Sequence, residues 1–87
     1  GKDETWVIAT LARLTRTRPD IIQPGNRLAD LGVDSLTRVE LVGAMEARLG
    51  FRLDDATASA LSLVQDLLDL ARADRPRAGR AVDSARG

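Results

Sequence analysis

Three residue types that build reactive sites are missing from this 87-residue chain, which contains no cysteine, no histidine and no tyrosine. Without cysteine it forms no disulfide and offers no thiolate to a metal ion or a substrate. Without histidine it lacks the commonest general base and the commonest metal ligand, which excludes a hydrolytic triad or a zinc site built on that residue. The chain is therefore not expected to be an enzyme in its own right.

Long apolar runs and an excess of either charge are also missing. No window approaches the roughly 18 apolar residues of a membrane span, and no charged-then-apolar leader opens the chain. We therefore expect neither a membrane segment nor a signal peptide, and a cytoplasmic location. Basic and acidic residues balance at 13 each, so no overall field attracts nucleic acid. A chain with 44% apolar and 30% charged residues has the composition of one small globular domain.

Apolar residues recur at helical spacing in the first part of the chain. This spacing predicts a first helix over residues 4–16, with Thr5 or Asp3 as its cap. Pro19 is expected to close that helix, because a proline pushes the preceding residue out of the helical region.

Three further helices are predicted downstream. The second runs from Ser35 to Leu49 and stops at Gly50. A short third helix covers residues 56–60, and Ser62 is expected to cap a last helix. One face of this last helix is expected to carry an apolar stripe of Val64, Leu67, Leu68 and Ala71. No segment alternates with a period of two. The sequence therefore predicts an all-α, four-helix bundle of three long helices and a short third one.

The long connection between the first two helices contains Pro24-Gly25 and Gly32, yet it also carries large aliphatic residues. A disordered linker would not be expected to carry them, so we predict an ordered loop pinned by Ile21, Ile22, Leu28 and Leu31. Residues 74–87 are rich in Arg, Ala and Gly with little to bury, and they are predicted to be a flexible tail behind a domain of residues 1–73. The tail arginines are interpreted as aiding solubility: Arg75, Arg77 and Arg80.

The second helix has apolar residues on two faces. One contiguous stripe is expected to face the core: Leu41, Val42, Met45 and Leu49. Leu36 lies opposite that stripe, in line with Gly43 and Ala47. Such a face suits docking of a partner helix or groove, although single exposed leucines are common in proteins without such a role.

Ser35 stands at the start of the second helix. Serine in that place is most often an N-cap. Asp34 can cap equally well and adds a negative charge at the positive end of the helix. If Asp34 caps, the Ser35 hydroxyl is available to carry a phosphate ester, which a helix N-terminus favours.

The stretch "DLGVDSLTRVELVGAME" resembles the phosphopantetheine attachment motif of acyl carrier proteins, in which a leucine, a glycine and one further residue precede Asp-Ser-Leu at the start of the second helix. The likeness extends over residues 4–72, through the first helix, the long loop, the short third helix and "VQDLLDL" in the last helix. It implies that a phosphopantetheinyl transferase attaches 4'-phosphopantetheine from coenzyme A to Ser35, and that Asp34 helps present the serine and the transferase's magnesium. It also implies that partner enzymes touch the second helix at Leu36, Val39, Glu40, Gly43 and Glu46.

The chain departs from stand-alone carriers of fatty acid synthesis, whose second helix is strongly acidic. Here Arg38, Arg48 and Arg52 interrupt the acidic positions, so electrostatic steering of partners should be weak. Together with the linker-like tail, this favours a carrier domain of a multidomain polyketide synthase or related enzyme. Its expected partners are the transferase and the acyl-loading, condensing and processing enzymes of a polyketide or fatty-acyl pathway. We expect no nucleic-acid or membrane partner, and a monomer when the domain is isolated.

Three alternatives remain open from the sequence. A peptidyl carrier would share the fold and the cofactor but carry aminoacyl groups, and its motif more often has paired glycines before the serine. A helix-turn-helix nucleic-acid binder would need a basic face, which the second helix lacks. A purely structural bundle would carry no prosthetic group. Asp54-Asp55 is only a faint metal signal, and Trp6 is expected at the edge of the core.

Overall fold

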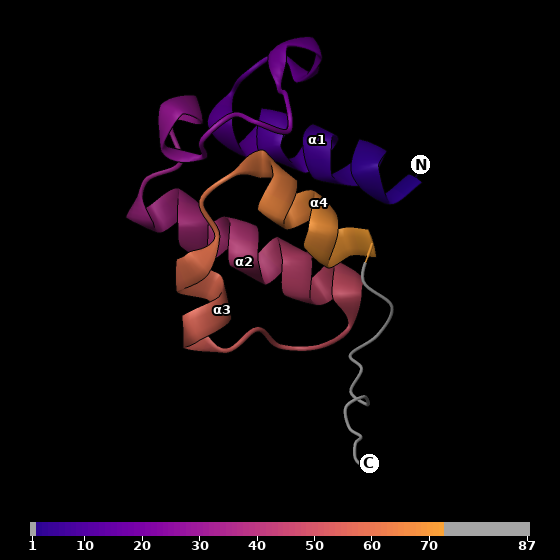
Figure 1. Ribbon diagram of the computed structural model, residues 1–87, viewed down its shortest axis with the longest axis vertical. Coiled ribbons are helices and arrows are strands. Elements are labelled where there is room, and N and C mark those ends of the chain that lie inside the picture. The colour runs from indigo at the N-terminus through magenta and orange to yellow at the C-terminus, as the bar shows by residue number, and fades with distance from the viewer. Residues whose placement is uncertain (1, 73–87) are drawn as a thin grey trace.

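The computed structural model describes residues 2–72, which form four α-helices and two short 3₁₀ helices (Figure 1). Residues 2–72 contain no strand, and their one extended pairing is an isolated antiparallel bridge between Arg27 and Leu63. The predicted all-α, four-helix fold is confirmed. The predicted tail, including its arginines, lies outside the described residues, so the division of the chain after residue 73 stays a prediction.

Helix α1 extends over Lys2–Thr15, and both of its predicted ends were misplaced. Asp3 and Thr5 lie inside the helix, where the carboxylate of Asp3 places negative charge in the first turn. At the other end Arg16 adopts a left-handed conformation with φ of 56°, which ends the helix before Pro19 can act. Pro19 instead begins the 3₁₀ helix η1, Pro19–Ile21, where its fixed φ suits a first helical position.

Helix α2 extends over Ser35–Leu49, as predicted. Asp34 is its N-cap. Gly50 ends it in the left-handed conformation with φ of 83° and donates its backbone N–H to the Glu46 carbonyl at 2.8 Å. A glycine adopts this conformation without the steric cost of a Cβ, which is why the sequence signal was reliable here.

The two remaining helices each begin slightly away from the predicted residue. Helix α3, Asp55–Ala60, follows an N-cap provided by Asp54. Helix α4 extends over Val64–Arg72, so Ser62 lies one residue too early to be its N-cap. The carboxylate of Asp66 in the first turn accepts the backbone N–H groups of Ser62 at 2.8 Å and Leu63 at 2.9 Å. This side chain binds the two residues just before α4, and both of them lie outside the helix.

The core lies between α1, α2 and α4 (Figure 1). The predicted stripe of α4 is fully confirmed, since Val64, Leu67, Leu68 and Ala71 are all buried. On α2 the stripe is buried at its centre, at Leu41 and Met45, whereas Val42 and Leu49 are half-buried. Trp6 lies at the edge of the core as expected, with the Arg48 guanidinium 5.2 Å from its ring centroid.

The long loop is ordered by buried aliphatic side chains and by backbone hydrogen bonds to α4. Leu28 and Ile22 are buried and Leu31 is half-buried, which confirms three of the four predicted anchors. Ile21 was wrongly included: it ends η1 on the side facing water and is 55% exposed, because its neighbour Ile22 takes the inward position.

Three backbone hydrogen bonds fix the loop against the start of α4. The Leu28 N–H donates to the Ser62 carbonyl at 2.8 Å. In return, Val64 N–H donates to the Asn26 carbonyl at 3.0 Å and Gln65 N–H donates to the Pro24 carbonyl at 2.9 Å. These loop carbonyls satisfy donors that the first turn of a helix cannot pair internally. These bonds fix the loop at residues 24–28, a few residues before α2 begins.

Candidate functional site

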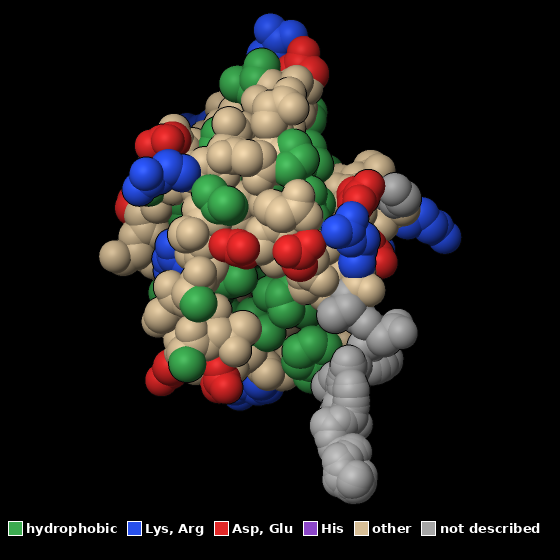
Figure 2. Space-filling view, viewed as in Figure 1, with side chains coloured by type: hydrophobic (Ala, Val, Ile, Leu, Met, Phe, Trp, Pro, Cys, Tyr) green, Lys and Arg blue, Asp and Glu red, His purple; other side chains and the backbone are tan. Residues whose placement is uncertain are grey.

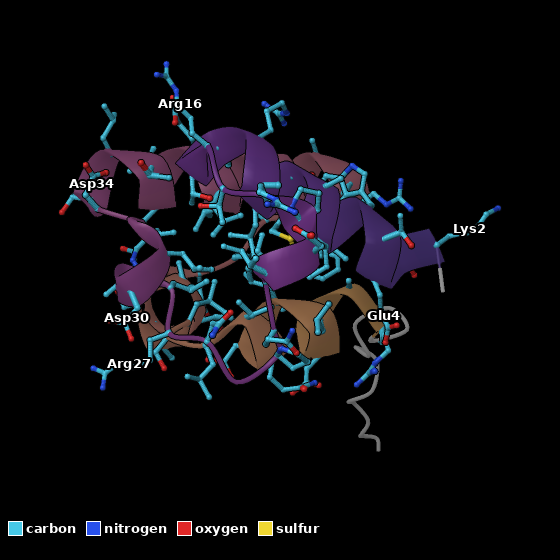
Figure 3. All side chains as sticks on the ribbon, turned by 90° about the horizontal axis from the view of Figure 1, so that it is seen from above. Lys2, Glu4, Arg16, Arg27, Asp30 and Asp34 are labelled. Carbon is cyan, nitrogen blue, oxygen red and sulfur yellow. The ribbon has the colours of Figure 1, made fainter. Side chains whose placement is uncertain are left out.

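The start of α2 is presented by a short, anchored turn. The 3₁₀ helix η2, Ala29–Leu31, ends at Gly32 with φ of 95°. Val33 follows as a buried anchor and donates its backbone N–H to the Leu28 carbonyl at 3.0 Å. With Val33 held inside, the next residue emerges at the surface, and Figure 3 shows Asp34 at this outer edge, directed away from the body of the protein.

Asp34 caps α2, and this leaves the neighbouring serine available. Its Oδ1 accepts the backbone N–H of Thr37 at 2.8 Å, and this bond holds the pKa of the Asp34 carboxyl below its ordinary value. Ser35 is exposed, and within residues 2–72 its hydroxyl has no hydrogen-bond partner. The alternative in which Ser35 serves only as the N-cap is therefore wrong.

These residues fit a phosphodiester on Ser35 Oγ. The hydroxyl projects from the first position of a fifteen-residue helix, where backbone N–H groups and the helix dipole favour an anion. Because no internal hydrogen bond of the described chain uses this hydroxyl, an ester would displace none of them.

The outward face of α2 continues from Ser35 along the helix. Leu36 and Val39 are 70% and 69% exposed, which is far more than large apolar side chains in the core. Glu40 and Gly43 are also exposed, and a Cβ at Gly43 would meet no atom within 4 Å apart from its chain neighbours and the adjacent backbone of its own helix. Four of the five residues predicted to meet partners thus lie on the surface in the described structure.

Glu46, the fifth predicted partner residue, has an internal contact. It is half-buried, and its Oε2 accepts the backbone N–H of Leu53 at 2.8 Å. This bond ties the segment before α3 to α2. The resemblance placed Glu46 among the residues that partners touch but gave no sign of this bond.

Arg38 is the residue of this region that the sequence pattern failed to interpret. Its Nη1 donates to the Leu61 carbonyl at 2.7 Å and to the Ala58 carbonyl at 3.2 Å, so it holds the end of α3. Arg48 is engaged too, since its guanidinium donates to Asp3 Oδ1 at 3.0 Å. Both arginines of α2 are thus engaged in contacts with other parts of the chain, Arg48 at the surface, and this helix offers no basic face of the kind that a nucleic-acid reader presents.

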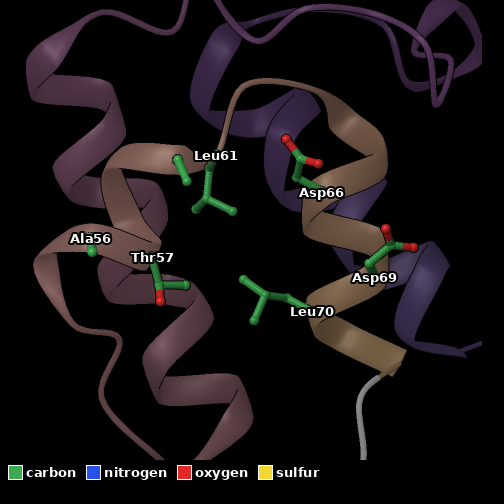
Figure 4. A pocket seen from close by; sticks show the side chains of 7 residues that line it. Ala56, Thr57, Leu61, Asp66, Asp69 and Leu70 are labelled. Carbon is green, nitrogen blue, oxygen red and sulfur yellow. The ribbon is translucent and has the colours of Figure 1, made fainter.

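Two open grooves flank α3. One of about 560 Å³ lies between α3 and α4, where Leu61 and Leu70 face one another and Asp66 and Asp69 lie on α4 (Figure 4). Figure 2 shows hydrophobic side chains gathered in this hollow, beneath two acidic side chains. The other, of about 430 Å³, lies between α2 and α3 and includes Val39, Val42 and Leu53 in its lining.

The described residues provide no evident metal centre or membrane span. Among residues 2–72, no group of three or more acidic, histidine or cysteine side chains could hold a metal ion. The Asp54 carboxylate instead accepts the Thr57 N–H at 2.8 Å, which lowers its pKa and explains why an acidic residue precedes α3. Within the same residues, no helix is both long and apolar enough to cross a membrane.

Comparison with known proteins identifies the family. Residues 5–71 match the family described as "Phosphopantetheine attachment site". The chain belongs to this family. It is an acyl carrier domain, as the resemblance of its motif implied, and the group that it carries is covalently bound 4'-phosphopantetheine.

A similar curated protein is the non-reducing polyketide synthase tazA of Aspergillus terreus. The carrier domain is 34% identical to it over 62 residues, which cover 71% of the chain and 2% of the synthase. The chain thus corresponds to a very small part of this relative.

Proposed function

We propose that Ser35 Oγ is the attachment point of 4'-phosphopantetheine and that Asp34 presents it. Two observations at the start of α2 support this proposal. Asp34 caps the helix, and the exposed Ser35 hydroxyl has no hydrogen-bond partner within the described residues. A group on Ser35 would leave the cap in place and would stand at the favourable end of the helix dipole.

The protein binds its partner enzymes and exposes the Ser35 hydroxyl to them, and these enzymes activate the hydroxyl for reaction. No histidine exists in the chain to deprotonate a hydroxyl, and the described structure gives Ser35 no hydrogen-bonded base. A phosphopantetheinyl transferase must therefore activate Ser35 and take the group from coenzyme A. When bound, the group supplies the thiol that this cysteine-free chain lacks, and an acyl chain is held there as a thioester. The domain itself is proposed to be non-catalytic.

The cargo is proposed to be a polyketide or related acyl chain within a multidomain synthase. The similarity to a polyketide synthase supports this choice over an aminoacyl cargo. The partners are proposed to be the transferase together with loading, condensing and processing enzymes in the cytoplasm, meeting a monomeric domain at the outward face of α2. A covalent link to the same synthase would raise the local concentration of these enzymes, so a small apolar contact would suffice.

Substitution of Ser35 by alanine tests the attachment site. Intact mass spectrometry after incubation with coenzyme A and a broad-specificity transferase should show one added phosphopantetheine on the natural chain and none on Ser35→Ala. Ser59→Ala, which alters an exposed serine on α3, is the matched control and should be modified normally. Both variants should unfold at the same denaturant concentration as the natural chain, because neither side chain is buried.

Two results would contradict the assignment. One is a folded natural chain that keeps its polypeptide mass under these conditions, and the other is a Ser35→Ala variant that still gains the group. A loaded carrier that accepts aminoacyl groups from an adenylating enzyme, but no acyl donor, would replace the proposed cargo with the peptidyl alternative.

A further inference from the structure

Helix α3 is held in place differently from the other described helices. It buries none of its six residues, whereas α1, α2 and α4 each bury at least two. Burial of apolar side chains is the main force that fixes a helix in a small domain. Within α3 this force is weak, and the nearest core anchor is the buried Leu61 that follows the helix. Polar contacts therefore have a larger share in fixing the position of α3 than in the other helices.

Two polar contacts from α2 reach the two ends of the α3 segment. The Arg38 guanidinium binds the Ala58 and Leu61 carbonyls at the C-terminal end of α3. The Ala58 carbonyl also accepts the Leu61 N–H at 3.4 Å, and the negative end of the helix dipole favours a cation at this position. The Glu46 carboxylate accepts the Leu53 N–H just before α3 begins. Both are charge-assisted hydrogen bonds from half-buried side chains, which water and salt weaken less than exposed ones.

The spacing of these contacts brings α3 beside the modified end of α2. Arg38 lies about one helical turn after Ser35, and Glu46 lies about two turns further on, along one side of the helix. The groove of about 430 Å³ between α2 and α3 lies between the two contacts. Figure 1 shows the C-terminal end of α3 next to the first turns of α2. The end of α3 therefore lies about one helical turn along α2 from Ser35, and its position shapes the surface there.

We propose that Arg38 and Glu46 are positioning residues that latch α3 onto α2 and thereby form the surface that the transferase meets beside Ser35. The latch itself is a property of the folded chain, and only its effect on the transferase rests on the proposed function. Arg38→Lys keeps the charge and a nitrogen with several donors, but its side chain is shorter than that of arginine, so it should preserve part of the latch. Glu46→Gln keeps an oxygen that can accept the Leu53 N–H and should preserve more of it than Glu46→Ala.

Amide hydrogen exchange on the unmodified protein tests the latch. Arg38→Ala should speed exchange at residues 58–61 about tenfold, which is the scale of one hydrogen bond to a charged group, while amides of α1 and α4 change less than about twofold. Glu46→Ala should speed exchange at Leu53, and Glu46→Gln should largely restore it. Arg52→Ala and Glu40→Ala are matched controls that remove a single charge from exposed residues without a side-chain hydrogen bond in the described structure.

Transferase kinetics test the consequence for presentation. Arg38→Ala should raise the KM for the carrier about fivefold and leave kcat within about twofold, because Ser35 and the Asp34 cap are untouched. Arg38→Lys should lie between Arg38→Ala and the natural chain. Arg13→Ala, which removes an exposed arginine on α1 away from the groove, is the kinetic control and should match the natural chain.

Each outcome decides one part of the proposal. Unchanged exchange at α3 in both alanine variants, or faster exchange throughout the domain, would overturn the latch. A loosened α3 with an unchanged KM would overturn its role in presentation. A natural chain that the transferase never modifies would overturn the proposed function, while the exchange measurement would still decide whether the latch exists.

Discussion

The two faces of α2 place the same residue type in opposite environments. Leu41 is 1% exposed and packs in the core, whereas Leu36, less than two turns earlier, is 70% exposed. The inward leucine stabilises the fold through removal of its surface from water and through close packing. The outward leucine contributes little of either, so the fold does not require an apolar residue at this position. A leucine that the fold does not require is explained more readily by a partner.

Further along α2, the side chains on its two sides again differ in exposure. The inward side continues into Met45, which is fully buried. The outward side continues into Val39 and Gly43, which leave open space above the helix. Stability is thus assigned to one side of the helix and the proposed recognition to the other, so substitutions on the two sides should have separable effects.

Truncation of each leucine should give the largest difference between the faces. Leu41→Ala should lower the free energy of unfolding by about 2–5 kcal/mol, because a fully buried leucine leaves a cavity. Leu36→Ala should change it by no more than about 0.5 kcal/mol, as is usual for surface positions. Denaturant unfolding of both variants measures these changes. Similar losses for the two would show that the faces are not energetically distinct.

Introduction of a charge on the outward face should give the next largest effect. Leu36→Asp should lower kcat/KM of the transferase or a synthase partner about tenfold, because it places a carboxylate where an apolar contact is expected. The midpoint of thermal unfolding should hardly change, since the side chain is exposed. Ile21→Asp is the matched control, because Ile21 is also a large exposed apolar residue but lies on η1. Equal losses in the two variants, or none in either, would count against the docking face.

Acid should change the free energy of unfolding least, through carboxyl groups at the starts of the helices. Backbone N–H groups lower the pKa of Asp34 and Asp54, and those of Leu63 and Ser62 lower the pKa of Asp66. A carboxyl whose pKa is lower in the folded state stabilises the fold above its unfolded value, about 4, and loses this contribution as the pH falls through the folded value. The free energy of unfolding should therefore decrease below about pH 4.

Substitution of Asp34 by asparagine isolates the contribution of this carboxyl to the loss of stability in acid. Asp34→Asn keeps an oxygen acceptor for Thr37 but cannot titrate, so its unfolding free energy should fall less steeply between about pH 5 and pH 2. Asp30→Asn is the control, because the exposed Asp30 carboxylate has no hydrogen-bond partner within residues 2–72. An equally steep decline in Asp34→Asn and in the natural chain would remove the cap of α2 as a source of acid sensitivity.

Most of the fold could be predicted from local signals, and the errors also have local causes. The bounds of α2 were correct because Asp34 and Gly50 mark its ends through backbone chemistry that involves only near neighbours. The end of α1 was misplaced because a non-glycine residue, Arg16, takes a left-handed conformation that no sequence signal announces. The start of α4 was misplaced because its first donors pair with carbonyls of the distant loop, and Asp66 binds the N–H groups of Ser62 and Leu63 just before the helix.

The sequence by itself determined the four helices, the apolar stripes that form the core, and the motif that assigns the chain to its family, because each depends on spacing along the chain. Only the tertiary structure decided that Ile22 and not Ile21 faces inward, and that Arg38 and Glu46 hold the α3 segment. Arg38 bonds to carbonyls 20 and 23 residues away, and Glu46 to a backbone N–H 7 residues away across a turn. Periodicity within one helix carries no information about such partners, because their proximity is created by the packing of separate segments.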